Sequence, residues 1–205
     1  MKLKIQPPAW LRMLYPGALW RLNRSDKVVY LTFDDGPTPE VTSWVLDLLD
    51  EENVLATFFC LGKNVEAHPT LFKDLVQRGH RIGNHSYSHR QSFQTSTHIY
   101  VADVENAAKF IESKLFRPPY GQLGFRSFFK LRKNYSIVFW DVLSEDYNPD
   151  CTPEQVVDNV MRFTRPGSLV VFHDSVKAFP RLKMALPEVI VRLKSNGYKF
   201  GVLPI

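Results

Sequence analysis

Short apolar runs rich in β-branched and aromatic residues alternate with segments of helical periodicity along most of this chain. One short run near Phe116 and six longer runs predict strands, the longer ones at 28–33, 54–60, 80–84, 135–140, 168–173 and 198–203. Because helical patterns separate most of these runs, we expect parallel strands joined by crossover helices. This number of strands favours an incomplete or distorted β/α barrel over an open doubly wound sheet, and periodicity alone leaves both open.

Capping signals predict where several of the helices begin and end. The Thr-Pro pair at 38–39 predicts an N-cap and a first turn, and Thr-Pro-Glu-Gln at 152–155 predicts a capping box. Gly197 predicts the end of the last helix. Apolar residues at three- and four-residue steps predict the buried stripe of a further helix: Val104, Ala108, Ile111 and Leu115.

The composition is that of one globular domain, with 44% hydrophobic and 23% charged residues among 205. Its two cysteines, Cys60 and Cys151, are too few for a disulfide framework or a thiolate zinc finger, and they are compatible with a reducing compartment. No internal repeat or linker follows residue 27, which indicates a single domain.

The formal net charge of +5 is concentrated at the N-terminus. Residues 1–27 hold one acid and six basic residues, so the remainder of the chain carries equal numbers of each sign. A neutral body argues against a nucleic-acid partner. We therefore predict a basic leader over 1–27 that packs along a main domain at 28–205. Its basic residues are Lys2, Lys4, Arg12, Arg21, Arg24 and Lys27.

Aromatic residues within this leader, namely Trp10, Tyr15 and Trp20, leave open a peripheral contact with an anionic membrane surface or polymer. Prolines and arginines interrupt every apolar run of the leader, so neither a signal peptide nor a transmembrane segment is predicted. These patterns favour a location in the cytoplasm or at the periphery of a membrane.

Two adjacent carboxylates, Asp34 and Asp35, directly follow the first predicted strand, where the loops of a parallel β/α fold converge. Because adjacent side chains diverge, one carboxylate can bind a metal while the other accepts a proton from water. A solvated Asp-Asp-Gly turn is the alternative. Four further polar clusters follow later strands and are predicted to meet them on one rim: His85 with His89, Arg117, residues 141–146, and His173.

The pair His85 and His89 supplies imidazole ligands that would share one face if this segment were helical. Two histidines and one carboxylate leave an open position on a tetrahedral Zn²⁺, which is typical of a catalytic site. Co²⁺, Ni²⁺, Mn²⁺ and Fe²⁺ also accept these ligands. Two unrelated surface histidines are the alternative.

The segment Arg117-Pro118-Pro119-Tyr120 predicts a stiff loop, because the prolines restrict φ and lack a donor. The Tyr120 N–H is then the next backbone donor and could serve an oxyanion hole, while Arg117 could hold a carboxylate in its ionised form. A rigid connection with a solvated arginine is the alternative.

His173 ends an apolar run and is expected at a strand end with little water around it. A protonated histidine there could donate to a leaving amine if a carboxylate such as Asp146 fixed its tautomer and raised its pKa. A histidine that only caps the strand is the alternative.

Taken in order, these blocks resemble the polysaccharide deacetylase family, carbohydrate esterase family four. The resemblance spans residues 28 to about 175 and implies a distorted (β/α)7 barrel and the metal-dependent removal of an N-acetyl group from a sugar. The blocks that carry it are Thr-Phe-Asp-Asp-Gly at 32–36, Ala-Thr-Phe-Phe at 56–59 through Gly62, His-x-x-x-His at 85–89, Arg-Pro-Pro-Tyr-Gly at 117–121, the 140–147 segment, and Val-x-His at 171–173.

The resemblance also implies roles for single residues. Asp34 corresponds to the general base, His173 to the general acid, and the Tyr120 N–H to the oxyanion donor. Arg117 corresponds to the residue that orients the base, and Asp146 to the partner of His173, with Asp141 as a competing candidate. The implied metal ligands are Asp35, His85 and His89, and the implied substrate-binding residues are Pro118, Pro119, Tyr120, Tyr147 and Val171.

Two residues depart from the family pattern. Tyr147 stands where the family usually has Trp, and Val171 stands where it usually has Leu, so the glycan and the acyl group accepted could differ. The expected substrate is N-acetylglucosamine-containing glycan of the peptidoglycan or chitin type. The alternatives are an O-acetyl xylan esterase, a deformylase of a lipid-linked amino sugar, and a catalytically silent carbohydrate-binding protein. A two-metal phosphoesterase is disfavoured because no second ligand set is evident.

Overall fold

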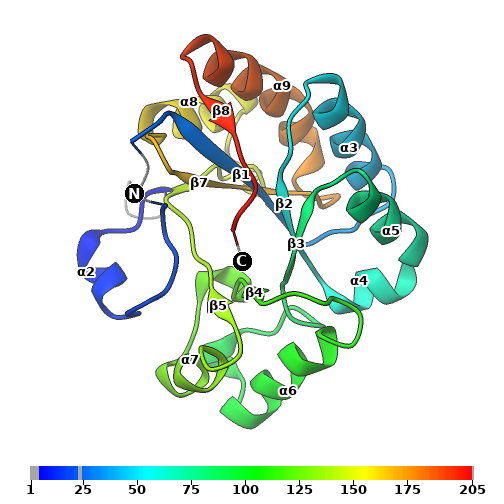
Figure 1. The fold of residues 1–205 in the computed structure, drawn as a ribbon, viewed down its shortest axis with the longest axis vertical. Coiled ribbons are helices and arrows are strands. Elements are labelled where there is room, and N and C mark those ends of the chain that lie inside the picture. The colour runs from blue at the N-terminus through cyan, green and yellow to red at the C-terminus, as the bar shows by residue number, and fades with distance from the viewer. Residues whose placement is uncertain (1–4, 23–24, 205) are drawn as a thin grey trace.

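In the computed structural model, which describes residues 5–22 and 25–204, the chain forms a half-barrel of parallel strands surrounded by helices (Figure 1). Seven of the described strands follow one hydrogen-bonded order, β5-β4-β3-β2-β1-β7-β6, and β8 pairs with β1. The predicted α/β class and distorted (β/α)7 barrel are therefore confirmed. The strands are β1 (Val28–Asp34), β2 (Thr57–Cys60), β3 (Arg81–Asn84), β4 (Leu115–Phe116), β5 (Ser136–Ile137), β6 (Val142–Leu143), β7 (Leu169–His173) and β8 (Lys199–Phe200).

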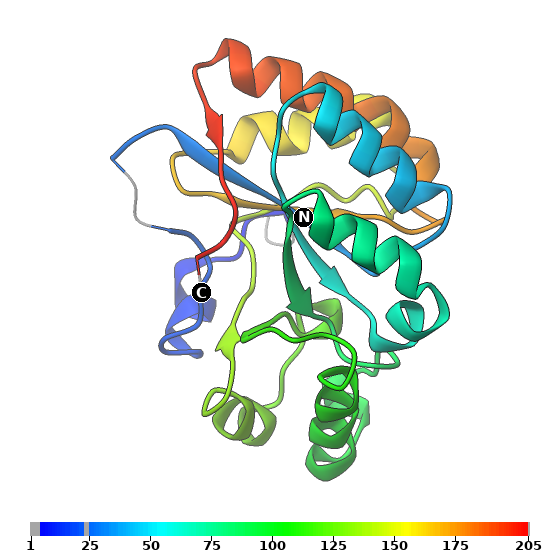
Figure 2. The same ribbon diagram turned by 45° about the vertical axis from the view of Figure 1, so that its right-hand side comes forward.

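Helices cover the outside of this sheet (Figures 1 and 2). The largest apolar core lies under α3, α8 and α9, where the ring of Phe33 stacks on those of Phe58 and Phe172. No helix in the described ranges is long and apolar enough to cross a membrane. The helices are α2 (Ala9–Met13), α3 (Val41–Glu51), α4 (Gly62–Ala67), α5 (Pro69–Gln77), α6 (Thr97–Ala107), α7 (Phe125–Leu131), α8 (Pro153–Phe163) and α9 (Phe179–Ser195), with the 3-10 turns η1 (Ser92–Gln94) and η2 (Pro119–Gly121).

The helix starts and ends that the sequence predicts from capping residues are confirmed in part. The capping box is confirmed, because the Gln155 N–H donates to Thr152 Oγ1 at 3.3 Å and the Thr152 N–H donates to Gln155 Oε1 at 2.9 Å. Gly197 follows α9 with φ of +77°, as a helix terminator should. The predicted N-cap at Thr38 is wrong: α3 begins at Val41, and the Thr38 N–H donates to Thr42 Oγ1 instead.

The helix predicted from the stripe ending at Leu115 is too long. α6 ends at Ala107, Ala108 is exposed, and Leu115 belongs to β4, where it pairs with Ser136. Apolar residues at three- and four-residue steps are compatible with one continuous helix or with separate elements. Here the hydrogen-bonded pairing of β4 with β5 outweighs continuation of the helix to Leu115.

The strand predicted at 135–140 is also wrong in its extent, because β5 covers only Ser136–Ile137 and the next strand, β6, begins beyond the predicted one, at Val142. The N-terminal segment accounts for the interruption. The Leu19 N–H donates to the Ile137 carbonyl, the Phe139 N–H donates to the Leu19 carbonyl, and the Leu22 N–H donates to the Gly167 carbonyl. Residues 19–22 therefore run between the β5 side of the sheet and the start of β7.

Aromatic packing anchors this N-terminal segment. Trp20 is 6% exposed and its ring stacks on Phe139 at 4.2 Å, while the Tyr15 hydroxyl donates to the Leu123 carbonyl at 2.6 Å. Lys2, Lys4 and Arg24 of the predicted leader lie outside the described residues. Packing of residues 15–22 against the barrel should therefore contribute to its stability.

Replacement of Trp20 by Ala should lower the free energy of unfolding by about 3 kcal/mol, because a buried ring and its contacts are lost. Urea denaturation followed by circular dichroism measures this change. Trp10→Ala is the matched control, since Trp10 is 62% exposed. Equal midpoints for the two variants would show that the segment is not anchored through Trp20.

Candidate active site

Five carboxyl-terminal strand ends converge on one rim of the half-barrel. Asp34 at the end of β1 lies in register with His173 of β7 and with Phe59 of β2. The next steps of the register align Cys60 with Asn84 of β3, and Asn84 with Phe116 of β4. His85 and Arg117 therefore leave neighbouring strands at the same edge as Asp34, which is the physical reason that distant parts of the sequence meet there.

Asp34 is buried and is held by Arg117. Arg117 Nη1 donates to Asp34 Oδ1 at 2.7 Å and to Thr32 Oγ1 at 2.7 Å, while Nη2 donates to the Phe139 carbonyl at 3.0 Å. Burial raises the pKa of Asp34, but the positive charges of Arg117 and of nearby imidazoles lower it further, so that the net pKa lies below its usual value. The carboxylate is thus ionised and fixed in orientation.

Asp35, His85 and His89 bring one carboxylate and two imidazoles together. One ligand atom from each lies within 4.8 Å of the other two. Asp35 Oδ1 is 3.7 Å from His85 Nε2 and 3.2 Å from His89 Nε2, and it is buried without a hydrogen bond from the described residues. An unsatisfied buried carboxylate oxygen facing two imidazole nitrogens fits a divalent cation.

The surroundings of the two histidines orient both rings toward the cluster. His85 Nδ1 lies 2.8 Å from the Arg117 carbonyl, which accepts only from a protonated Nδ1, so Nε2 is the His85 nitrogen directed at the cluster as a ligand atom. Burial and the neighbouring His85 lower the pKa of His89 to about 4, so the His89 ring is neutral at pH 7. Nε2 is therefore the ligand atom that each ring presents to a cation.

The helix considered for the segment between the two histidines is not formed. Residues 85–89 form a loop in which Ser86 and His89 have φ of +66° and +59°. The side chain of Asp103, on α6, organises this loop. It accepts hydrogen bonds from the Ser88 N–H at 3.1 Å, the Ser88 hydroxyl at 2.6 Å and the Tyr87 N–H at 3.2 Å.

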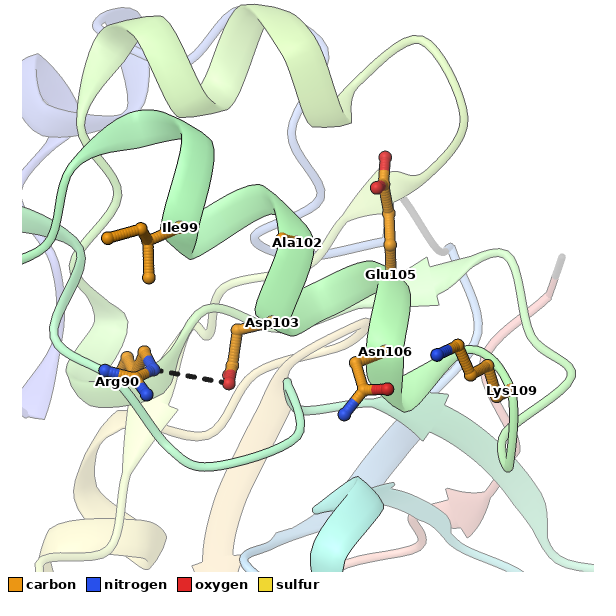
Figure 3. Close-up of a pocket in the computed structure, with 7 residues that line it drawn as sticks. All are labelled: Arg90, Ile99, Ala102, Asp103, Glu105, Asn106 and Lys109. Carbon is orange, nitrogen blue, oxygen red and sulfur yellow. Dashed lines mark hydrogen bonds and ion pairs between the residues drawn. The ribbon is translucent and has the colours of Figure 1, made fainter.

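Asp103 also pairs with Arg90 at 3.4 Å, and Figure 3 shows the two side chains pointing toward one another beside a hollow on the outer side of the loop. Sequence reasoning missed Asp103. Its signal was available, because Tyr100, Asp103, Val104 and Ala107 share the buried face of α6, and a buried acid on an apolar helix face needs a partner. The hollow contains none of the predicted catalytic or metal-binding residues.

His173 and Asp146 form an ion pair at the end of the strand next to that of Asp34, because His173 is the register partner of Asp34 on β7. His173 Nδ1 lies 2.8 Å from Asp146 Oδ1, and the His173 N–H donates to Asp146 Oδ2 at 2.8 Å. Burial lowers the pKa of His173, but the Asp146 carboxylate raises it by more, to about 9. The imidazole is therefore protonated at neutral pH.

Asp141, the competing candidate, does not contact His173 and does not lie on this rim. Its carboxylate accepts from Arg12 at 2.7 Å, from Arg165 at 2.8 Å and from the Ser168 hydroxyl at 2.7 Å. Arg165 and Ser168 precede β7, so these bonds place Asp141 toward the amino end of that strand. The sequence analysis placed Asp141 on the rim because Asp141 follows an apolar run. No described strand ends at Asp141, however, and the next strand, β6, begins only after it, at Val142.

A second acid that sequence reasoning missed, Asp174, braces the loop after β1. Asp174 Oδ1 accepts from the Gly36 N–H at 3.0 Å, and Oδ2 accepts from the Thr42 hydroxyl at 2.6 Å. Burial raises the pKa of Asp174 to about 8, against the lowering effect of Thr42. A Cβ on Gly36 would lie 1.9 Å from this carboxylate, so only glycine allows the approach. Adjacency to His173 was its only sequence signal.

The remaining predicted residues differ in exposure. Tyr120 is exposed and its ring centroid lies 4.5 Å from that of His89, whereas Pro118 and Pro119 are buried beneath the loop. The Tyr147 ring meets His173 edge-on at 4.9 Å. Val171 is fully buried within β7. Tyr120 thus lies beside His89, and Tyr147 lies beside His173.

This fold and arrangement of strand-end residues identify the class of protein. The chain belongs to the polysaccharide deacetylase family, whose sequence pattern it matches over residues 21–135. It is 34% identical over 190 residues to a peptidoglycan-N-acetylglucosamine deacetylase of Bacillus cereus, and the match covers 88% of each chain.

Solved structures show the same fold. A peptidoglycan N-acetylglucosamine deacetylase in complex with 4-naphthalen-1-yl-N-oxidanyl-benzamide matches with a TM-score of 0.84 and 31% identity, over 96% of this chain and 94% of that chain. A wild-type CE4 family pseudoenzyme from Bacillus anthracis matches with a TM-score of 0.81 and 27% identity, over 94% and 69%. Because the same fold occurs in a pseudoenzyme, activity has to be argued from the site residues.

Proposed function

We propose that this protein is a metal-dependent hydrolase that removes N-acetyl groups from N-acetylglucosamine-containing oligo- or polysaccharide of the peptidoglycan or chitin type and releases acetate. The observation that carries the proposal is the position of Asp34. Its carboxylate is ionised, held by Arg117, and 4.0 Å from His85 Nε2, next to but outside the Asp35, His85 and His89 cluster. A base beside a ligand set is what hydrolysis by an activated water requires.

Asp35, His85 and His89 would hold the cation. A bound divalent cation would act as a Lewis acid toward the amide carbonyl and would make water more acidic. Zn²⁺ is the cation we favour, because two histidines and one carboxylate are typical of its catalytic sites. Co²⁺, Ni²⁺, Mn²⁺ and Fe²⁺ accept the same donor atoms.

The residues of this chain account for the proton transfers. Asp34 accepts a proton from the attacking water, whose oxygen forms a bond to the acetyl carbon, while Arg117 keeps the carboxylate oriented. The Tyr120 N–H donates to the oxyanion that develops on the former carbonyl. His173, protonated through its contact with Asp146, gives its proton to the departing nitrogen as the C–N bond breaks. The products are acetate and a free amino sugar.

Mass spectrometry of N-acetylated and O-acetylated oligosaccharides, with and without chelator, tests the proposal. We expect acetate and a new amine from peptidoglycan- or chitin-type oligosaccharides, and no product after the chelator has removed the metal. Acetate from acetylated xylan alone would indicate an O-acetyl esterase, and formate from a formylated amino sugar would indicate a deformylase. Binding of oligosaccharide without any product would indicate a silent carbohydrate-binding protein.

Replacement of Asp146 by Asn should move the alkaline limb of the kcat/KM pH profile to lower pH. His173 is charged below about 9 because Asp146 outweighs the effect of burial, so loss of that charge lowers its pKa. A shift of at least about one pH unit is expected from the loss of a directly paired carboxylate. Asp141→Asn is the control, since its carboxylate pairs with Arg12 and Arg165 instead. An unmoved limb in the Asp146 variant would refute the role of His173 as proton donor.

Replacement of Asp103 by Asn should weaken metal binding while leaving all three ligands in place. The amide retains one acceptor oxygen but loses the second, so the loop between His85 and His89 is held by fewer bonds. Loss of a supporting interaction of this kind lowers metal affinity by about 10–100-fold. Competition with a colorimetric chelator measures the affinity, and Asp74→Asn on α5 is a surface control. Equal affinity in both variants would contradict the bracing role.

A further inference from the structure

Two neighbouring helices of this protein each expose an apolar face. Trp10 and Met13 of α2 and its C-cap Leu14 recur at steps of three and four residues and are 62%, 80% and 44% exposed. On α7, Phe125 and Phe129 recur at a step of four and are 52% and 54% exposed. A surface helix normally turns its apolar residues toward the core, so these exposed apolar residues are unusual.

The opposite faces of the same helices anchor them to the barrel and to one another. Leu11 of α2 and Phe128 and Leu131 of α7 pack into one apolar cluster. Tyr15, directly after α2, stacks on Phe125 at 5.6 Å and meets Phe128 edge-on at 5.2 Å. Figures 1 and 2 both show α2 and α7 as neighbours on the side of the sheet away from α3 and α9. The exposed apolar residues therefore belong to one region, here called the α2–α7 face.

Basic residues of α7 and of the turn after it lie beside this face. Arg126, Lys130, Arg132 and Lys133 are exposed and form no ion pair with any residue of the ranges 5–22 and 25–204. The sequence contains no acid over 1–25 or over 113–140, the two stretches that contain α2 and α7. One acid borders the face, because Glu105 of α6 lines a hollow together with Lys130. The charge is thus strongly one-sided, in a chain whose remainder beyond residue 27 is neutral.

Exposed Trp, Met and Phe beside Lys and Arg that form no ion pair with the described residues are typical of a surface that enters the interface of an anionic lipid bilayer. A soluble polyanion would use the charges but would gain little from the apolar residues. We propose that the α2–α7 face docks this protein onto an anionic membrane surface, with its apolar residues inserted among the lipid headgroups. Docking does not depend on the proposed reaction, and its test does not use activity.

Co-sedimentation of the full chain with lipid vesicles tests this proposal. Binding is expected to vesicles of phosphatidylcholine mixed with phosphatidylglycerol, and little binding is expected to phosphatidylcholine alone. Lys130→Glu with Lys133→Glu should weaken binding by more than about tenfold, because each basic residue near an anionic surface contributes about fivefold. Met13→Ser with Phe129→Ser should weaken it by at least about tenfold through lost apolar burial.

Matched controls separate docking through this face from loss of folding and from nonspecific adsorption of exposed apolar residues to vesicles. Met184→Ser with Val191→Ser removes two comparably exposed apolar residues from α9 and should leave binding unchanged. Trp10→Phe should keep binding but lose most of the blue shift that tryptophan fluorescence shows on vesicle addition. Circular dichroism and urea midpoints of each variant establish that it is folded.

Four results would overturn the proposal. One is equal sedimentation with neutral and anionic vesicles, and a second is an equal effect of the α9 control. The third is binding to a soluble polyanion such as heparin as tight as binding to anionic vesicles, which would assign the face to a polymer. Concentration-dependent dimerisation that Met13→Ser abolishes, without vesicle binding, would likewise show that a second copy of the chain covers the face.

Discussion

Replacement of Asp34 by Asn is expected to lower kcat by about 10²–10⁴-fold while the bound metal is retained. The amide oxygen can still accept the hydrogen bond from Arg117 Nη1, which is 2.7 Å long in the wild type, so the side chain should keep its place. An amide cannot accept the proton of water at neutral pH. The loss therefore falls on the chemical step, and the Asp35, His85 and His89 cluster is untouched.

Three measurements on the Asp34→Asn variant separate its outcomes: acetate release at saturating substrate, metal content by elemental analysis, and the urea midpoint. Asp47→Asn is the matched control, because Asp47 is an exposed acid that pairs with Arg78 on the outer surface. Turnover equal to that of the control would refute Asp34 as the general base. Loss of metal together with turnover would instead make Asp34 part of the ligand set.

Replacement of His85 by Ala is expected to remove the metal and, with it, turnover. The ring is almost fully buried and its Nε2 lies 3.7 Å from Asp35 Oδ1, and its removal leaves only Asp35 and His89 of the described ligand cluster. Loss of even an outer supporting partner costs about 10–100-fold in affinity, and loss of a direct ligand should cost more than about a hundredfold.

His89→Ala provides an independent variant, because His89 is more exposed than His85 and its removal leaves a smaller defect in packing. Both variants should match chelator-treated wild-type protein in turnover and in metal content. His98→Ala, an exposed histidine on α6, should retain both. Full metal content in the His85 and His89 variants would show that the cation is held elsewhere, and the hydrolase proposal would lose its basis.

The rule that polar residues at the carboxyl ends of parallel strands meet on one rim predicted much of the site. Asp34, His85, Arg117 and His173 each follow an apolar run, and parallel strands bring such positions to one edge whatever the loop lengths between them. Asp141 followed the same rule and failed. The strand in its run ends at Ile137, where Leu19 bonds to residues on either side of Val138, and β6 begins only after Asp141. No local pattern at 135–146 indicates that Leu19 is the partner.

Supporting residues were less accessible to sequence reasoning. Asp103 holds the loop between His85 and His89 from a helix position 15 to 16 residues further along the chain, and Asp174 holds Gly36 from 138 residues away. Their carboxylates are satisfied only by groups that folding brings near. The helical geometry considered for the two histidines failed for the same reason, since Asp103 stabilises a loop with positive φ at Ser86 and His89 instead.

The sequence by itself determined the parallel β/α class, the rim on which chemistry gathers and the residue types available there, because strand period, helix caps and strand-end polarity are local properties. Only the tertiary structure decided that Asp146 rather than Asp141 meets His173, that Asp103 and Asp174 brace the site, and that α2 and α7 expose one apolar, basic face. These outcomes depend on contacts between residues far apart in the chain, and their energies arise only when the sheet and its N-terminal segment have packed together.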